Sequence, residues 1–453
     1  MTVKKTKFLL FLVDYALLVL ALYVVLVIRY RPEVLAFEFS RHMRAFGWIF
    51  LLWLLTFYIA DLYNYVERVD YRAFISAIAI NIAIAIAAFY LLPQLDIAPR
   101  RNLALVAGFF SLFFMIWRSL FNRLMEQSGV AQSVIFVGSD EFSLQLAKRI
   151  ADRPRLGYKV AAIVQTRDTL IPRWVVDHGI PVYREVGELR EPLEQRLREA
   201  RVVISDHWLR EGRGELYGMI RAGLRFYQLS SFWEELEEAI PIFATNEAWF
   251  LQNMNRGINR VHLASKRAMD IVLTVPAAAV ALPIMLLFGA LVRMTSKGPI
   301  IYRQVRVGRN NRNFVLYKFR SMRQDAELNG AQWASENDPR VTAVGKFMRQ
   351  TRIDELPQIV NILRGDMSLV GPRPERPEFV EQLSQAIPHY HLRHMVPPGL
   401  TGWAQVRYQY GASEEDAAVK LMYDLYYVKN LSLLFDIRIL LKTILTVVNK
   451  MGR

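Results

Sequence analysis

Four long apolar stretches occupy the first part of the chain, before any other regular pattern appears. They lie at residues 8–28, 46–63, 74–92 and 103–120. Each is about as long as the ~17–25 residues that a helix needs to cross the hydrocarbon core of a bilayer. The first stretch is too long for a cleaved signal peptide, and the small residues of a cleavage site do not follow it. We therefore expect four transmembrane helices within residues 1–125.

Positive charges around the first stretch bear on its orientation. Four crossings bring both ends of this region to one side, and Lys4, Lys5 and Lys7 indicate that this side is cytoplasmic. The bias is weakened by four arginines that fall on the opposite side: Arg29, Arg31, Arg41 and Arg44. We expect the rest of the chain to lie on the cytoplasmic side.

Short β-branched runs alternate with amphipathic helical patterns after the fourth apolar stretch. The expected elements are strands at 133–137, 159–165, 201–205 and 224–229, the last two each preceded by a helical pattern, and a helix at Glu141–Asp152. This alternation predicts βαβ units and a small parallel sheet. We expect a Rossmann-like domain over residues 126–254.

The first turn of this domain decides whether it binds a dinucleotide. Such a site needs a glycine-rich turn, so that the backbone can approach a pyrophosphate at a helix N-terminus. The turn here reads Val137-Gly138-Ser139-Asp140-Glu141, with one glycine and two acids where phosphate would lie. We therefore interpret the domain as structural or regulatory.

A fifth apolar segment, at residues 271–292, is also long enough to span a bilayer. Pro276 and Pro283 interrupt it, and a proline inside a helix removes a hydrogen bond and bends the axis. Both flanks are basic, with Lys266 and Arg267 before it and Arg293 and Lys297 after it. A helix that breaks near Pro283 and returns to the same side fits this pattern, as does an ordinary kinked crossing.

The composition narrows the partners of the remaining segment. There is no cysteine, which excludes disulfides and thiolate metal sites. The net charge is +15, and the segment from Arg256 to Arg323 holds thirteen Lys and Arg against one acid, Asp270. An anionic partner such as a phosphate or diphosphate is therefore expected. A membrane-anchored chain without a nucleic-acid motif is not expected to bind nucleic acid.

Cationic and acidic residues then follow in order. Seven basic residues come first: Arg303, Arg306, Arg309, Arg312, Lys318, Arg320 and Arg323, the last of them around a strand-like run at 314–320. Asp354 and Glu355 come next, beside Arg349 and Arg352. A carboxylate held among cations stays ionised and can attack phosphorus, and its neighbour can hold Mg²⁺. No P-loop accompanies the pair, which excludes an ordinary NTPase.

Four motifs carry a resemblance to a known family. They are Lys266-Arg267 with Asp270, residues 317–322, residues 354–358, and residues 398–402. From about residue 265 to the C-terminus the chain resembles the monotopic phosphoglycosyl transferases, the bacterial sugar transferase family. With the preceding spans and the Rossmann-like domain, the whole chain resembles the large enzymes that initiate capsule, exopolysaccharide and O-antigen synthesis in bacteria.

The resemblance implies a fold, a reaction and a set of roles. It implies a catalytic domain over 255–453 with a re-entrant helix at about 266–294 that breaks at Pro283, on the cytoplasmic face of the bacterial inner membrane. Asp354 matches the nucleophile and Glu355 the residue that binds Mg²⁺. The basic positions around the phosphates match Lys318, Arg320, Arg349 and Arg373, the last within the stiff turn Gly371-Pro372-Arg373-Pro374.

The implied substrates are a UDP-sugar and undecaprenyl phosphate, with UMP and a polyprenyl diphosphate sugar as products. Contact with membrane phospholipid follows, and a homodimer is compatible with the resemblance. One departure is Leu282, which stands where the family usually has a serine before the proline. Two other classes remain open: a non-catalytic membrane scaffold of polysaccharide assembly, and a nucleotide-sugar oxidoreductase or dehydratase acting through the Rossmann-like domain.

Overall fold

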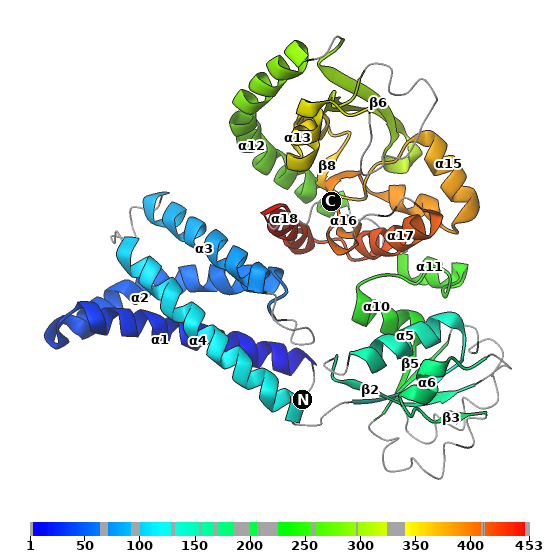
Figure 1. Cartoon of the computed structure of the whole chain (residues 1–453), viewed down its shortest axis with the longest axis horizontal. Helices are drawn as coiled ribbons and strands as arrows, with labels where there is room; N and C mark the ends of the chain where they lie inside the picture. Colours follow the sequence, from blue (N-terminus) through cyan, green and yellow to red (C-terminus); the bar gives the residue numbers. More distant parts are fainter. Residues whose placement is uncertain are drawn as a thin grey trace. The chain divides into compact units, whose positions relative to one another are not determined.

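A computed structural model describes most of the chain (Figure 1). The described residues are 3–63, 71–91, 100–127, 132–153, 156–165, 170–184, 188, 200–205, 208, 225–254, 260–295, 298–323, 340–408, 411 and 413–448. The chain divides into two compact units, residues 1–229 and 230–453. Each unit is described by itself below.

The first unit begins with four apolar helices, as the hydrophobic pattern predicts. They are α1 (Val3–Arg29), α2 (Pro32–Ile59), α3 (Tyr71–Leu91) and α4 (Arg100–Gln127). Helix α2 begins well before the expected start at residue 46. Pro32 is at its first turn with Glu33, and both favour a helix N-terminus, so the polar residues ahead of the apolar stretch are helical too.

Aromatic rings form the core between these helices. Phe57 stacks on Phe110 with ring centroids 5.5 Å apart, and Phe74 stacks on Phe114 at 4.4 Å. On the outer surfaces, large apolar side chains are exposed, among them Trp48 at 74%. All four helices are long and apolar enough to cross a bilayer, and among the described residues so is α12 of the second unit. The expected membrane region of apolar helices is thus confirmed, whereas its arrangement as a four-helix bundle stays a prediction.

An all-parallel sheet makes up the rest of the first unit and confirms the predicted α/β domain. Its strands are β1 (Gln132–Val137), β2 (Tyr158–Val164), β3 (Val182–Tyr183), β4 (Arg201–Ile204) and β5 (Arg225–Gln228), in the order β3-β2-β1-β4-β5. The helical patterns expected before β4 and β5 lie outside the described residues. Helix α5 (Glu141–Asp152) has the predicted bounds, because Asp140 caps it by accepting a hydrogen bond from the Ser143 backbone N–H. Short β3, preceded by α6 (Arg173–Asp177), was not predicted.

The second unit is built mainly from short elements. They are α10 (Leu229–Glu237), α11 (Glu247–Met254), α12 (Arg260–Thr295), β6 (Ile301–Val307), η4 (Arg309–Asn311), β7 (Asn313–Phe319), α13 (Ala343–Thr351), η5 (Ile353–Gln358), α14 (Ile359–Arg364), β8 (Ser368–Val370), α15 (Pro377–Ala386), η6 (Tyr390–Met395), β9 (Gly399–Thr401), α16 (Trp403–Arg407), α17 (Glu414–Lys429) and α18 (Leu433–Val448). Strands β6 and β7 form an antiparallel hairpin, and β8 pairs in parallel with β9.

Helix α12 contains the fifth apolar segment. It continues through Pro276 and Pro283 as one helix and follows a curved path (Figure 1). A proline inside a helix bends it without ending it when the lost hydrogen bond is tolerated. Most of the apolar side chains of α12 are exposed, including Val272 at 67% and Leu286 at 68%. The re-entrant insertion of this helix, like the expected three-domain division of the chain, stays a prediction.

A buried ion pair between α1 and α4 offers a test of how the membrane helices associate. The Arg118 guanidinium donates to the Asp14 carboxylate at 2.7 Å, and both side chains are almost fully buried. We expect Asp14→Leu to lower the free energy of unfolding by about 3–5 kcal/mol, because it leaves a buried guanidinium without its counter-charge. Unfolding in mixed micelles, followed by tryptophan fluorescence, measures the loss.

The matched control replaces both partners. Asp14→Leu combined with Arg118→Met buries no uncompensated charge, so we expect the double variant to recover most of the lost stability. A single variant as stable as the parent, or a double variant no better than the single one, would show that the pair does not hold α1 against α4.

Candidate active site

Charged residues in the N-terminal part of α12 form hydrogen bonds with α14 and β8, two elements near Asp354 and Glu355. Arg267 donates to the backbone carbonyls of Ile362 and Leu363 at the end of α14. Asp270 accepts from the Ser368 hydroxyl and from the Leu369 backbone N–H, each at 3.0 Å. The bonds from Arg267 satisfy carbonyls that a helix end leaves free, and together with those to Asp270 they fix α12 to both α14 and β8.

A second set of bonds joins α12 to α18. Lys266 donates to Asp436 at 2.8 Å, and both side chains are buried. The Tyr427 hydroxyl donates to the other Asp436 oxygen at 2.7 Å and so satisfies that carboxylate further. A buried ion pair of this kind requires such additional hydrogen bonds, because desolvation of both charges is costly. The apolar helix is therefore held in a defined position against the polar part of the unit.

Asp354 and Glu355 lie together on the 3₁₀ helix η5. Arg352 precedes it with φ 59°, a left-handed conformation that ends α13 and turns the chain into η5. Both carboxylates are largely buried, each residue being 8% exposed. Strand β7 packs beside η5 and brings Lys318 to the pair. The carboxylates are thus placed by the rigid hairpin and by the turn that Arg352 makes.

Three cations converge on one oxygen of Glu355. Lys318 Nζ lies 3.3 Å from Oε1, Arg373 Nη2 donates to it at 3.1 Å, and Arg352 Nη1 lies 3.6 Å away. Burial opposes ionisation of Glu355, but the three positive charges outweigh it and hold the pKa of this carboxyl well below its usual range. Glu355 is therefore a permanent anion that gathers the cations of the site.

Asp354 has the opposite electrostatic character. Burial raises its pKa and the charge of Glu355 adds to the rise, while Lys318, Arg349 and Arg352 offset only part of it. Its Oδ1 atom is buried and makes no hydrogen bond with the described residues. A carboxylate with a raised pKa and an unused oxygen is more basic than its neighbour, and the role of Asp354 as the nucleophile stays a prediction.

The loop that carries Arg373 is fixed by close backbone packing. A Cβ atom at Gly371 would lie 2.3 Å from the Pro397 carbonyl oxygen, and one at Gly399 would lie 2.1 Å from the Gly371 nitrogen. Two hydrogen bonds, Gly371 N–H to the Thr401 carbonyl and Gly399 N–H to the Pro372 carbonyl, hold the segments together. Only glycine permits this contact between the Arg373 loop and β9.

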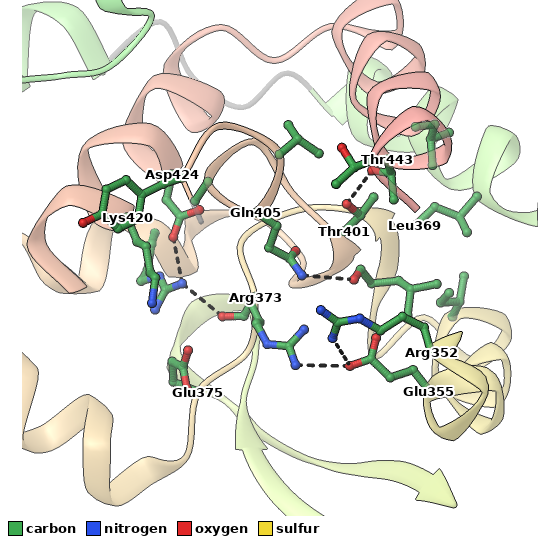
Figure 2. Close-up of a pocket in the computed structure, with 18 of the residues that line it drawn as sticks. Arg352, Glu355, Leu369, Arg373, Glu375, Thr401, Gln405, Lys420, Asp424 and Thr443 are labelled. Carbon is green, nitrogen blue, oxygen red and sulfur yellow. Dashed lines mark hydrogen bonds and ion pairs between the residues drawn. The ribbon is translucent and has the colours of Figure 1, made fainter. Parts of the chain in front are cut away.

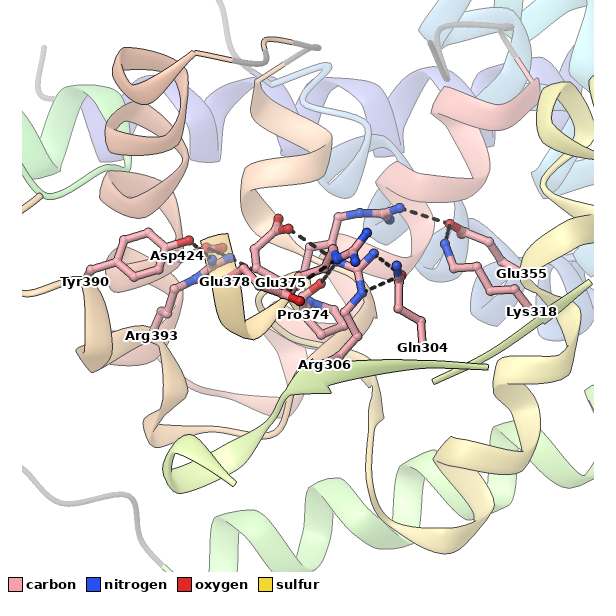
Figure 3. Close-up of polar contacts among 12 residues, drawn as sticks. Gln304, Arg306, Lys318, Glu355, Pro374, Glu375, Glu378, Tyr390, Arg393 and Asp424 are labelled. Atoms are coloured by element: carbon pink, nitrogen blue, oxygen red, sulfur yellow. Dashed lines mark hydrogen bonds and ion pairs between the residues drawn. The ribbon is translucent and has the colours of Figure 1, made fainter. Parts of the chain in front are cut away.

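Two arginines clamp the backbone on either side of the same loop (Figure 3). Arg306 donates to the Pro374 carbonyl at 3.0 Å, and Arg393 donates to the Arg373 carbonyl at 3.0 Å. Arg393 is itself held by a 2.7 Å ion pair with buried Asp424. The Arg373 side chain therefore leaves a backbone fixed by β6, η6 and α17, which orients its guanidinium toward Glu355.

A cavity of about 760 Å³ adjoins these residues (Figure 2). Glu355, Arg352 and Arg373 form a charged part of its wall. One end is largely apolar and is lined by α12 and α18, through Leu273, Ala277, Leu440 and Ile444. The other end is polar, with Glu375, Tyr390, Lys420 and Asp424. Of the two carboxylates of η5, Glu355 lines the cavity and Asp354 does not.

The four predicted basic residues differ in their position relative to Asp354 and Glu355. Lys318 and Arg373 meet Glu355 directly, and Arg349 acts on Asp354 while its Nε donates to the Ser321 hydroxyl at 2.9 Å. Arg320 is buried, and burial lowers its pKa, with the charge of Arg293 at the end of α12 adding to the effect. The structure thus gathers three of the four around the carboxylates, and the roles of all four in binding substrate stay predictions.

Two residues of the site were not among the predicted site residues, although the sequence analysis names one of them, Arg352, as a cation beside the acidic pair. Arg352 contacts Glu355 from three positions earlier in the chain, a spacing that sequence inspection can find when the turn is helical. Arg393 is distant in the sequence from both Arg373 and Asp424. No local spacing relates these positions, so only the folded chain reveals the clamp.

Comparison with known proteins finds one family of bacterial transferases and several of its members. The family described as "Bacterial sugar transferase" matches residues 261–450. A UDP-N-acetylgalactosamine-undecaprenyl-phosphate N-acetylgalactosaminephosphotransferase of Aeromonas hydrophila is 50% identical over 187 residues, 41% of this chain and 44% of that protein. A UDP-glucose:undecaprenyl-phosphate glucose-1-phosphate transferase of Escherichia coli is 42% identical over 190 residues, 42% of this chain and 40% of the relative.

A longer match covers both units of the chain. A protein of Haemophilus influenzae described as an uncharacterized sugar transferase is 30% identical over 377 residues, which are 77% of this chain and 76% of the relative. The two phosphotransferases named above are matched over less than half of their length. Similarity to these two proteins therefore covers less than half of this chain, whereas the family match at residues 261–450 includes η5 and the Arg373 loop.

The glycine packing beside Arg373 gives a test of how rigidly the site is held. We expect Gly399→Ala to lower the free energy of unfolding by about 3 kcal/mol, since the added Cβ meets backbone atoms that cannot move aside. Gly289→Ala on α12 is the matched control, because its Cβ would make an ordinary 3.6 Å contact with Ile300. Thermal unfolding of the purified variants measures both, and equal melting temperatures would refute the packing argument.

Proposed function

The chain belongs to the bacterial sugar transferase family, and we propose that it transfers a sugar-1-phosphate from a UDP-sugar to undecaprenyl phosphate. The products are UMP and a polyprenyl diphosphate sugar, which makes this the first membrane step of a bacterial polysaccharide. The observation that carries the proposal is the cavity in which cation-bound Glu355, the neighbour of Asp354, adjoins an apolar wall. The cations suit the phosphates of a soluble anionic donor, and the apolar wall suits the tail of a lipid acceptor.

The cation set suits the diphosphate of the donor. Lys318, Arg352 and Arg373 are held in place by Glu355 before any substrate binds. Guanidinium groups pair with phosphate oxygens in a bidentate manner, and preorganised cations stabilise charge that develops in a transition state without having to reorganise. The partly exposed Arg352 and Arg373 side chains both line the cavity, so they are the groups that meet phosphate first.

The reaction proceeds in two displacements at the β-phosphorus. A carboxylate oxygen of Asp354 forms a bond to phosphorus, and the bond to the bridging oxygen breaks, so that UMP leaves with the electron pair. A phosphate oxygen of the lipid then bonds to the same phosphorus, and the bond to Asp354 breaks to regenerate the carboxylate. Because Asp354 does not line the cavity, its side chain must turn toward the bound diphosphate for the first step.

Covalent transfer in two steps suits a site that serves two dissimilar substrates. The donor comes from water and the acceptor from the bilayer, and one set of cations can bind their phosphates in turn. The apolar wall of α12 and α18, with Leu273 and Leu440, gives the polyprenyl chain a path to Glu355 and Arg373. We propose that this path opens to the membrane along α12.

The donor set is compatible with Mg²⁺, which the resemblance implies. Mg²⁺ in phosphate sites is usually bound by one or two carboxylates together with substrate oxygens, and the described residues hold no larger cluster of ligands. All three ion pairs of Glu355 fall on Oε1. We therefore propose Oε2 of Glu355 as the Mg²⁺ ligand. A bound Mg²⁺ would neutralise diphosphate charge as UMP departs.

The placement in the membrane follows from the same proposal. Cytoplasmic UDP-sugars must reach the cavity, so we propose that the second unit and the Rossmann-like sheet face the cytoplasm of the inner membrane. Helix α12 then enters one leaflet and returns, with its basic residues at both ends on that face. The curvature of the helix through Pro276 and Pro283 supports this arrangement (Figure 1).

The first experiment measures UMP release. Full-length protein with Mg²⁺, undecaprenyl phosphate and a panel of UDP-sugars should release UMP from at least one donor. We expect Asp354→Asn to reduce the rate at least on the order of 10³-fold, because an amide cannot act as the nucleophile. Release without redox cofactor also argues against an oxidoreductase. No UMP from folded protein with any donor would favour the scaffold alternative, and full activity of Asp354→Asn would refute the mechanism alone.

The raised pKa of Asp354 gives a pH prediction. The nucleophile must be ionised, so single-turnover UMP release should fall as the pH drops through a value above the usual pKa of aspartate. Arg349→Gln removes a charge that lowers this pKa, so we expect the acidic limb to move to higher pH. Lys346→Gln, which alters an exposed charge on the same helix, is the control. An acidic limb that does not move in Arg349→Gln would contradict the assignment of Asp354.

A further inference from the structure

The cavity has two ends that lie on different sides of Arg373. Figure 2 places Glu375, Lys420 and Asp424 on one side of the Arg373 side chain, and Leu369 and Thr443 on the other. We call the first side the polar lobe: it holds the lining residues Glu375, Lys420 and Asp424, and Tyr390, which Arg393 joins to Asp424. The opposite side leads to the apolar wall of α12 and α18. The two ends therefore offer different chemistry to whatever binds at Arg373.

The proposed reaction requires such a division. In an in-line displacement, the attacking Asp354 and the departing UMP lie on opposite sides of the β-phosphorus. The second step reverses this geometry, so the lipid phosphate enters where UMP left. The sugar, in contrast, stays bonded to the same phosphorus through both steps. It must occupy space that neither the departing nucleotide nor the entering lipid crosses.

The polar lobe has the groups that recognise a sugar. The half-buried Phe379 ring lines the cavity and offers apolar surface to the C–H face of a pyranose, whereas the Tyr390 ring is buried at 2% exposure. The Tyr390 hydroxyl accepts from Arg393 at 2.6 Å, which leaves its own proton available for donation. Carboxylate and ammonium groups supply further acceptors and donors beside these rings. A lipid tail, which has no polar groups, gains nothing from such a lining.

Two charged residues of the lobe, Glu375 and Lys420, keep hydrogen-bonding capacity that a sugar could use. Asp424 is used structurally, since its 2.7 Å pair with Arg393 holds the Arg373 loop. Among the described residues, the Glu375 carboxylate makes a long 3.4 Å ion pair with Arg306 (Figure 3). Lys420 donates to the Gly411 carbonyl at 2.7 Å, and an ammonium group has two further N–H donors.

From this geometry, and resting on the proposed function, we propose that the polar lobe holds the sugar of the donor and that Glu375 and Lys420 determine which sugar is accepted. The Glu375 carboxylate accepts hydrogen bonds from ring hydroxyls. The Lys420 ammonium donates to a hydroxyl or to the carbonyl oxygen of an acetamido group. Sugars that differ in one hydroxyl or in an acetamido group then differ in transition-state binding, because a polar group of the lobe that is left unpaired is costly.

The test compares Glu375→Gln and Lys420→Met with the parent in full-length protein. The substrates are UDP-glucose, UDP-galactose, UDP-N-acetylglucosamine and UDP-N-acetylgalactosamine, and UDP serves as a sugar-free competitive inhibitor. We expect kcat/KM for the preferred donor to fall about tenfold or more, by unequal factors across the four sugars. The inhibition constant of UDP and the KM for undecaprenyl phosphate should change less than twofold.

Two further variants keep the test decisive. Glu378→Gln removes a neighbouring, exposed carboxylate that pairs with Arg376 outside the cavity, and it should leave the order of donor preference unchanged. Glu375→Asp keeps the charge beside Arg306 but shortens the reach into the lobe, and it should alter donor preference as well. If Glu375→Gln does not fold, Glu375→Asp and Lys420→Met carry the test.

Several outcomes would overturn the proposal. Equal losses for all donors together with weaker inhibition by UDP would place the nucleoside in the lobe, and a raised KM for undecaprenyl phosphate would place the acceptor there. Unchanged donor preference in active variants would refute the sugar site while leaving the transferase intact. A parent protein that releases no UMP from any donor would refute both proposals.

Discussion

The site is organised by one buried carboxylate, Glu355, whose Oε1 atom is shared by three cations. Lys318 comes from β7, Arg352 from the turn before η5, and Arg373 from the loop after β8. Like charges brought so close would repel one another without an anion between them, and the buried anion would be costly without the cations. Each element is thus stabilised by the others, and the positive charge of the site is assembled around Glu355 without any bound anion.

The second constraint is the attachment of an apolar helix to this charged centre. Lys266, Arg267 and Asp270 lie within about one turn of α12, and each bonds a different element. Such a triple attachment fixes the rotation of α12 as well as its position. The helix therefore presents a constant face to the cavity while its remaining surface is apolar and exposed. The proposed function needs such a fixed boundary, because it brings one substrate from water and the other from lipid to the same site.

The sequence predicts well those elements whose formation depends on residues close together in the chain. The four apolar stretches, the strand pattern and the bounds of α5 depend on hydrophobic period, β-branching and a capping aspartate, all readable within a few residues. The polar start of α2 was missed because its helix depends on Pro32 and Glu33 rather than on apolar content. Arg393 was missed for a different reason: its role depends on a tertiary contact, and no periodicity encodes that.

The two acidic neighbours of η5 show why a 3₁₀ helix suits this site. Successive residues of such a helix point about 120° apart, so adjacent carboxylates enter different surroundings. Glu355 faces the cations and has a depressed pKa, whereas Asp354 is buried with one unused oxygen and has a raised pKa. The charges of Lys318 and Arg352 act on both carboxylates, but only Glu355 pairs with them directly. The geometry of η5 therefore separates an anchoring anion from a basic one, although the sequence places them side by side.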